Sequence, residues 1–176
     1  MLQVAFMLAF FTIFWASFLF WGFGVSAVSI VLCILFIIGA GFIIFNAAKA
    51  KSAVRALPDD TDSPEDKKEQ RRWALIFSIQ GGAIGAVCAI LGTIGEYNYI
   101  VPAIVLIVGV HYFPLGAIYH TRIHFLVGTA VVAISLFCIR ALRFEILGLV
   151  AIGICAATAA ISTIILGIYI IRAAKP

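Results

Sequence analysis

Two ionisable side chains, His111 and Arg140, stand inside long apolar stretches of this 176-residue chain. His111 belongs to the run 109–116, which also holds Tyr112 and Pro114. An imidazole donates and accepts hydrogen bonds, moves protons and binds metals. Pro114 cannot donate to the carbonyl four residues earlier, so we expect a kinked helix with a freed backbone acceptor at this point.

The glycines at positions 109 and 116 give room for a backbone or a ligand to approach the imidazole. These observations predict a ligand-binding site made of His111 and its neighbours Tyr112 and Pro114, with Gln80 as a further polar contributor. The alternative is a buried neutral histidine that hydrogen-bonds to a neighbouring helix and serves packing alone.

Arg140 is the second ionisable side chain expected inside the membrane. Only 15 residues separate it from His124, about 22 Å of helix, which is too short to cross a hydrocarbon core of about 30 Å. Arg140 is therefore expected inside one leaflet, with Arg143 nearly one turn further along the same face. The two arginines are candidate anion-binding residues, or else they form a salt-bridged cap with Glu96 and Glu145.

No catalytic site and no metal site is predicted. His120 and His124 have the i, i+4 spacing of metal ligands on a helix, but no third ligand is placed near them, so we interpret them as interfacial anchors. The four cysteines occupy four different apolar stretches without a C-x-x-C pair, which is typical of packing residues: Cys33, Cys88, Cys138 and Cys155. Signatures of intramembrane enzymes are missing, and no cofactor is identified.

The stretch around His111 also carries a resemblance. Gly109-x-His111-Tyr112-x-Pro114-Leu115 resembles a motif of small, uncharacterised multi-span membrane proteins of prokaryotes. The resemblance covers the eight residues 109–116 and implies a membrane protein, with no activity attached.

The amino-acid composition indicates that the residues named above are carried by membrane-spanning helices. Hydrophobic residues make up 64% and charged residues 11% of the chain, against about 45–50% and about 25% in soluble domains. Net charge is only +4, which does not favour nucleic-acid binding. We predict one all-α membrane domain over residues 1–176, an up-and-down bundle of six spans with the lipid bilayer as its partner: Val4–Phe23, Ser26–Phe45, Trp73–Ile94, Tyr99–Ile118, Ile123–Leu142 and Leu147–Ile170.

The segment Lys49–Arg72 is the one long connection, with 7 basic and 6 acidic residues. We expect the second helix to extend beyond the membrane until Pro58 and the acids at 59, 60 and 62 end it. Ser63 then reads as an N-cap with Pro64 as the first helical residue, so a charged helical hairpin is predicted here.

Lys and Arg are distributed unequally between the two sides of such a bundle. Ten lie on the side of the termini and the hairpin, and two, Arg140 and Arg143, lie on the other. By the positive-inside rule both termini and the hairpin are cytoplasmic, in the cell membrane.

Small residues predict where the spans pack most closely. They form one face of the third span, where Gly81, Gly85 and Gly92 also offer a surface for a homo-oligomer, and they recur in the sixth span. These two spans are expected at the packed centre. The first span, rich in Phe and without charge, is expected to be the most exposed to lipid.

No Asp, Glu or Lys lies within the six predicted spans, which disfavours carboxylate-based proton relays and midplane cation sites. The function predicted is a small-solute transporter or channel-like protein with its polar site on the fourth helix; a lumen lined by His111, Gln80, Thr129 and Ser135 would favour it. The alternative is a non-catalytic accessory or regulatory membrane protein that acts through the cytoplasmic hairpin. Enzymatic activity is not predicted.

Overall fold

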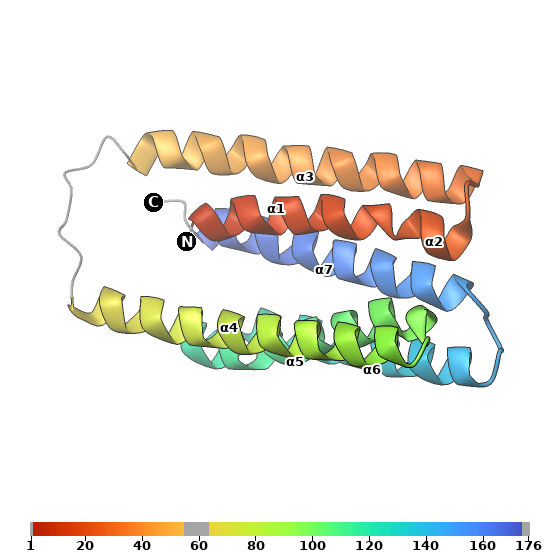
Figure 1. Ribbon diagram of the computed structural model, residues 1–176. Coiled ribbons are helices and arrows are strands. Elements are labelled where there is room, and N and C mark those ends of the chain that lie inside the picture. The colour runs from red at the N-terminus through yellow and green to blue at the C-terminus, as the bar shows by residue number, and fades with distance from the viewer. Residues whose placement is uncertain (1, 55–63, 174–176) are drawn as a thin grey trace. The chain divides into compact units, whose positions relative to one another are not determined.

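The computed structural model describes residues 2–54 and 64–173, and this part of the chain consists of helices joined by short turns, with no strand. A short 3-10 helix, η1, covers Tyr97–Tyr99. The α-helices, labelled in Figure 1, are α1 (Leu2–Ser17), α2 (Leu19–Phe23), α3 (Ala27–Val54), α4 (Pro64–Thr93), α5 (Ile100–Tyr119), α6 (Arg122–Arg143) and α7 (Val150–Ala173).

Six segments of the described chain are helical and long and apolar enough to cross a membrane, which confirms the predicted fold class. They lie within a few residues of the spans expected from the sequence: Val4–Phe23, Ala27–Lys49, Arg71–Thr93, Tyr97–Tyr119, Arg122–Arg143 and Val150–Ala173. The chain is thus an all-α, multi-pass membrane protein.

Two helices extend beyond their apolar segments, as predicted. α3 continues to Val54, and α4 begins at Pro64, several residues before its apolar part. Proline is favoured at the first helical position because its missing N–H has no intrahelical partner there. The rest of the predicted hairpin, including Pro58, the acids at 59, 60 and 62 and the Ser63 cap, lies outside the described residues.

The chain divides into two compact units. Unit 1 contains α1, α2, α3 and α7 from Ile152 onward, and unit 2 contains α4, η1, α5 and α6. The C-terminal helix therefore returns to the helices that begin the chain, while unit 2 is formed by the residues between. The single membrane domain expected from the sequence stays a prediction.

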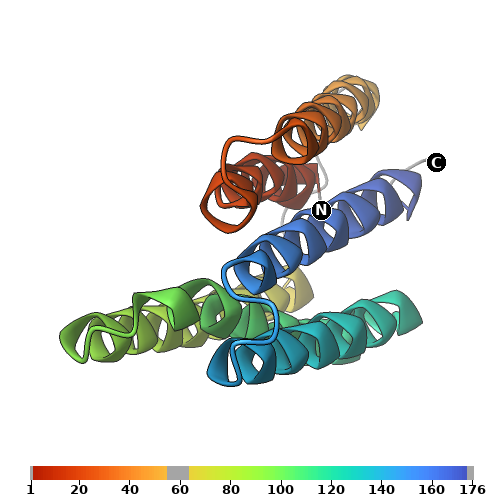
Figure 2. The same ribbon diagram turned by 90° about the vertical axis from the view of Figure 1, so that its right-hand side faces the viewer.

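In unit 1, α1 runs antiparallel to both α3 and α7, as Figures 1 and 2 show. α2 and α7 approach so closely that a Cβ on Gly22 would overlap the backbone of Gly153. Nearer the middle, the hydroxyls of Thr12 and Thr163 are 2.8 Å apart and form an interhelical hydrogen bond. Close approach of small residues and interhelical hydrogen bonds are the interactions that hold helices together in lipid.

The first span is not the most lipid-exposed one, which corrects the expectation from its Phe content. Thr12, Trp15 and Leu19 are each no more than 2% exposed. The span is also broken at Phe18, between α1 and α2, where the Phe18 amide donates to the carbonyl of Trp15. A buried face that packs on α3 and α7 therefore runs along one side of this helix.

In unit 2, α5 and α6 form a tight hairpin. A Cβ on Gly109 would lie within 3.0 Å of Val131 and Val132, and one on Gly128 would lie 3.0 Å from the Gly109 carbonyl. α4 packs on α5 through side chains larger than glycine. Within unit 2, nothing among the described residues lies within 4 Å of a Cβ built on any α4 glycine, so these glycines take no part in the packing of that unit. The small residues of α7 are closely packed within unit 1.

Candidate functional site

Three side chains of α4 share the face that packs on α5. Trp73, Phe77 and Gln80 are spaced four and three residues apart, which places them within about 60° of one another around the helix. The Trp73 and Phe77 rings are stacked with their centroids 4.1 Å apart and their planes at 30°. The two rings therefore lie against each other on this face of α4.

α5 brings His111 against this face. Its ring meets that of Phe77 edge-on, with centroids 4.6 Å apart and planes at 77°. The imidazole is only 7% exposed. We call the four residues Trp73, Phe77, Gln80 and His111 the α4–α5 polar seam.

Three polar atoms of the seam are enclosed and have no hydrogen-bond partner among the described residues: Trp73 Nε1, Gln80 Oε1 and His111 Nδ1. Most buried polar atoms in proteins are hydrogen-bonded, and leaving one unpaired costs about 1–3 kcal/mol. Trp73 and Gln80 lie about 10 Å apart along α4, so the atoms offer a donor, an acceptor and an imidazole nitrogen of either kind at successive levels of the helix. None carries a formal charge when the imidazole is neutral, so the seam matches a small neutral polar molecule or water.

Of the remaining residues of the predicted His111 site, Tyr112 stays near the imidazole, with ring centroids 5.8 Å apart, whereas Pro114 does not share its burial. Tyr112 is 3% exposed and faces α6, where its Cβ is 3.1 Å from a Cβ built on Gly128. Pro114 is exposed, as is Val110, whose carbonyl it leaves without the usual helical donor. α5 is a continuous helix through Pro114, and the kink stays a prediction.

The room provided by the two glycines of this run is taken by α6. Gly109 packs on Val131 and Val132, and a Cβ on Gly116 would come within 2.8 Å of the Phe125 ring. These glycines permit the close approach of α5 and α6 and do not open space at the imidazole. Of the two expected neighbours, a backbone or a ligand, these glycines therefore admit the backbone of α6.

Two of the four residues of the predicted lumen lie outside the seam, and the lumen itself stays a prediction. Thr129 is exposed on α6. Ser135 is buried, but its hydroxyl donates to the carbonyl of Val131 on its own helix, 2.8 Å away. Only His111 and Gln80 remain in the seam.

Arg140 and Arg143 are exposed near the end of α6 and are separate from the seam. Gly109 of α5 lies at the level of Val131 of α6, and the two helices are antiparallel, so His111 lies at the level of about residue 129. Arg140 is therefore about 16 Å further along the axis of α6. The Arg140 guanidinium lies over the Phe144 ring, 5.2 Å from its centroid. Pairing of these arginines with Glu96 and Glu145, or with an anion, stays a prediction.

The two other histidines do not share a helix. His120 ends α5 in a left-handed conformation, with φ of 51°, and α6 begins at Arg122. His124 is buried, and its Nδ1 is hydrogen-bonded to the Thr121 hydroxyl. The helical i, i+4 geometry is thus absent. No cluster of three potential metal ligands occurs among the described residues.

Trp73 and Phe77 are the site residues that the sequence analysis missed. Trp73 was considered only as the first residue of a span. The available signal was the spacing of Trp73, Phe77 and Gln80, which puts two aromatic rings and the only amide of this helix's apolar part on one face.

Comparisons of the chain with protein-family models, with curated proteins and with solved structures find no match. The resemblance of the 109–116 motif therefore remains an expectation, and any function must be argued from the seam itself.

Proposed function

We propose that this protein is a small-solute transporter or channel-like membrane protein in which the α4–α5 polar seam contacts a neutral polar solute. The observation that carries the proposal is the set of three enclosed polar atoms without partners, on Trp73, Gln80 and His111. Polar side chains inside membrane helices are costly, and function is a common reason for keeping them. A passing solute would supply the missing hydrogen bonds.

The charge pattern of the spans supports uncoupled passage. None of the six candidate spans contains Asp or Glu. Coupling to protons or cations at the bilayer midplane commonly uses such carboxylates. The proposed activity is therefore downhill movement of a neutral solute.

The test is the osmotic swelling of vesicles that contain the purified protein, with urea and glycerol as the probes. We expect swelling faster than in protein-free vesicles, and a several-fold loss for His111→Leu and Gln80→Leu. Thr129→Val is the matched control, because Thr129 is exposed on α6 at the level of His111. Equal swelling with and without protein for both probes would refute the proposal and favour the accessory or regulatory alternative.

We further propose that the protein resides in the cell membrane with both termini and the α3–α4 connection on the cytoplasmic side. The support is the ten-to-two distribution of Lys and Arg between the two sides. In a background without native cysteines, Lys68→Cys should react with a membrane-impermeant thiol reagent only after the cells are opened. Tyr97→Cys, on the opposite connection, should react in intact cells. The reverse pattern would overturn the orientation.

A homo-oligomer through Gly81, Gly85 and Gly92 is part of the same proposal. Within unit 2 these positions are open on the surface of α4, as a helix–helix contact requires. Gly85→Leu should reduce chemical cross-linking between copies in membranes, whereas Ala86→Leu, also exposed but about 100° around the helix, should not. Unchanged cross-linking of Gly85→Leu would remove this surface.

A further inference from the structure

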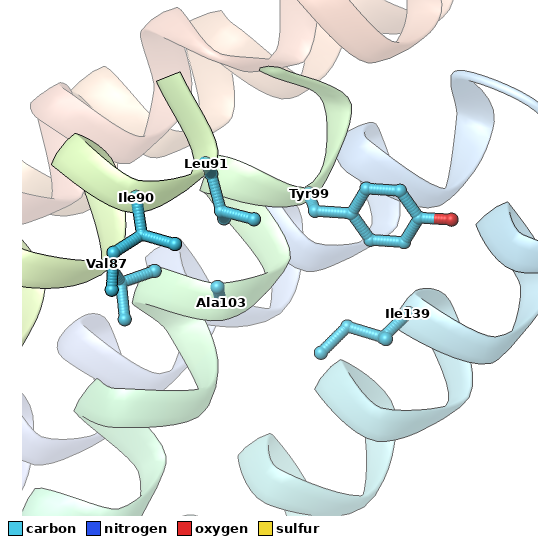
Figure 3. Close-up of a pocket in the computed structure, with 6 residues that line it drawn as sticks. All are labelled: Val87, Ile90, Leu91, Tyr99, Ala103 and Ile139. Atoms are coloured by element: carbon cyan, nitrogen blue, oxygen red, sulfur yellow. The ribbon is translucent and has the colours of Figure 1, made fainter. Parts of the chain in front are cut away.

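A second feature of unit 2 lies well away from the polar seam, at the end where α4 finishes and α5 begins. It is a pocket of about 280 Å³ between α4, η1, α5 and α6, shown in Figure 3. Its lining residues are Val87, Ile90, Leu91, Tyr99, Ala103 and Ile139. The Tyr99 ring lies above Ile139, with its phenol oxygen directed away from the α4 side chains.

The lining restricts the chemistry of an occupant. Apart from the phenol oxygen of Tyr99, the lining side chains carry no polar atom, so nothing in the pocket itself would bind a polar solute. Drug-sized ligands occupy pockets of about 300–1,000 Å³, and this one is slightly smaller. An alkyl chain is the ligand that fits both the size and the lining. In a membrane, the abundant source of alkyl chains is lipid.

A cationic side chain stands just beyond the pocket. Ile139 forms part of its wall, and Arg143 follows four residues later on the same face of α6, about 6 Å nearer the helix end. Arg143 is exposed, whereas the Arg140 guanidinium is held over the Phe144 ring. Arginine pairs with phosphate through two parallel hydrogen bonds. The acids of this end, Glu96 and Glu145, are exposed and lie beyond the helix ends.

We infer that this pocket and Arg143 together bind an anionic glycerophospholipid, with one acyl chain in the pocket and the phosphate against the guanidinium. The site is independent of the proposed solute passage, since it uses other residues nearer the end of the unit. The charge of Arg143 selects anionic over zwitterionic headgroups, and the apolar lining selects a chain over a free phosphate.

The experiment measures lipid binding to the purified protein in detergent by native mass spectrometry, with phosphatidylglycerol and phosphatidylcholine of identical chains as probes. The wild-type protein should bind phosphatidylglycerol roughly tenfold more tightly, as expected for one charge-assisted contact. Ala103→Leu fills the pocket and should reduce the binding of both lipids about tenfold. Ala89→Leu is the matched control on the exposed surface of α4 and should leave binding unchanged.

Arg143→Gln distinguishes the contribution of the lipid headgroup to binding from that of the acyl chain. In this variant the ratio of the affinities for phosphatidylglycerol and phosphatidylcholine should fall close to one, while chain-dependent binding persists. Arg122 is exposed at the other end of α6, so the control Arg122→Gln should keep the wild-type ratio. Leu91→Phe fills the same pocket from α4 and replaces Ala103→Leu if that variant does not fold. Three results would each overturn the inference. They are wild-type lipid binding by a folded pocket-filling variant, equal affinity of the wild-type protein for both lipids, and an unchanged preference for phosphatidylglycerol in Arg143→Gln.

Discussion

Replacing His111 with leucine tests whether the seam is kept for function or for stability. The change removes an imidazole that is 7% exposed and whose Nδ1 has no partner among the described residues. Relief of one unpaired buried atom should gain about 1–3 kcal/mol, and loss of the edge contact with Phe77 should cost about 0.5–1.5 kcal/mol. The free energy of unfolding should therefore change by between about −0.5 and +2.5 kcal/mol, mostly toward greater stability.

His124→Leu provides the contrast, because the two histidines are almost equally buried. His124 is 5% exposed, and its Nδ1 is hydrogen-bonded to the Thr121 hydroxyl. Losing that bond should lower stability by about 1 kcal/mol. Thermal unfolding in one detergent, followed by circular dichroism, should place the Tm of His111→Leu at or above the wild type and that of His124→Leu below it.

The reasoning would be refuted if His111→Leu proved the less stable of the two. Such a result would mean that His111 has a hydrogen-bond partner within the seam and serves packing. The proposed solute site would then lose its support. The swelling assay gives the independent measurement, since a stable His111→Leu protein that passes urea and glycerol normally would also contradict the role of the seam.

Other contacts give further expectations for stability in detergent. Gly22→Ala should lower the Tm strongly because its Cβ would overlap the backbone of α7, whereas Gly41→Ala, with nothing within 4 Å, should stabilise α3 by about 0.5–1 kcal/mol; similar losses for both would contradict the close approach. Arg140→Ala and Phe144→Ala should show a coupling of about 0.5–1 kcal/mol in a double-mutant cycle, and a coupling of zero would remove the cation–π contact. Thr12→Val should lower the free energy of unfolding by about 0.6 kcal/mol because the interhelical hydrogen bond is lost, and an unchanged Tm would show that this bond does not contribute to stability.

Sequence reasoning located the helices well, and the reasons are physical. Long apolar segments flanked by charges fix where each span lies, and Pro64 with its adjacent acids fixed the start of α4 correctly. The exposure of the first span was wrong because Phe content does not reveal which side of a helix finds a partner. Trp15 is buried, although an aromatic residue of a membrane helix can equally face lipid.

The candidate site was predicted in part for the same reason. His111 and Gln80 were identified because polar residues in apolar spans are conspicuous. Their partners depend on how α4 and α5 are rotated toward each other, and the edge contact of Phe77 with His111 reveals that rotation only in the structure. The glycines flanking His111 pointed to an opening, and only the contact of α5 with α6 shows that they are filled.

The composition of unit 1 has a consequence for how the protein is made. Its first helices are synthesised long before α7, which supplies Thr163 for the bond to Thr12 and Gly153 for the contact with Gly22. More than a hundred residues separate these partners, so at about 5–20 residues per second the ribosome needs on the order of ten seconds to join them. During that interval α1, α2 and α3 lie in the bilayer without the α7 residues that contact Thr12 and Gly22, while all the helices of unit 2 have been synthesised. Nascent chains arrested before α7 should therefore be the form that membrane chaperones and proteases recognise.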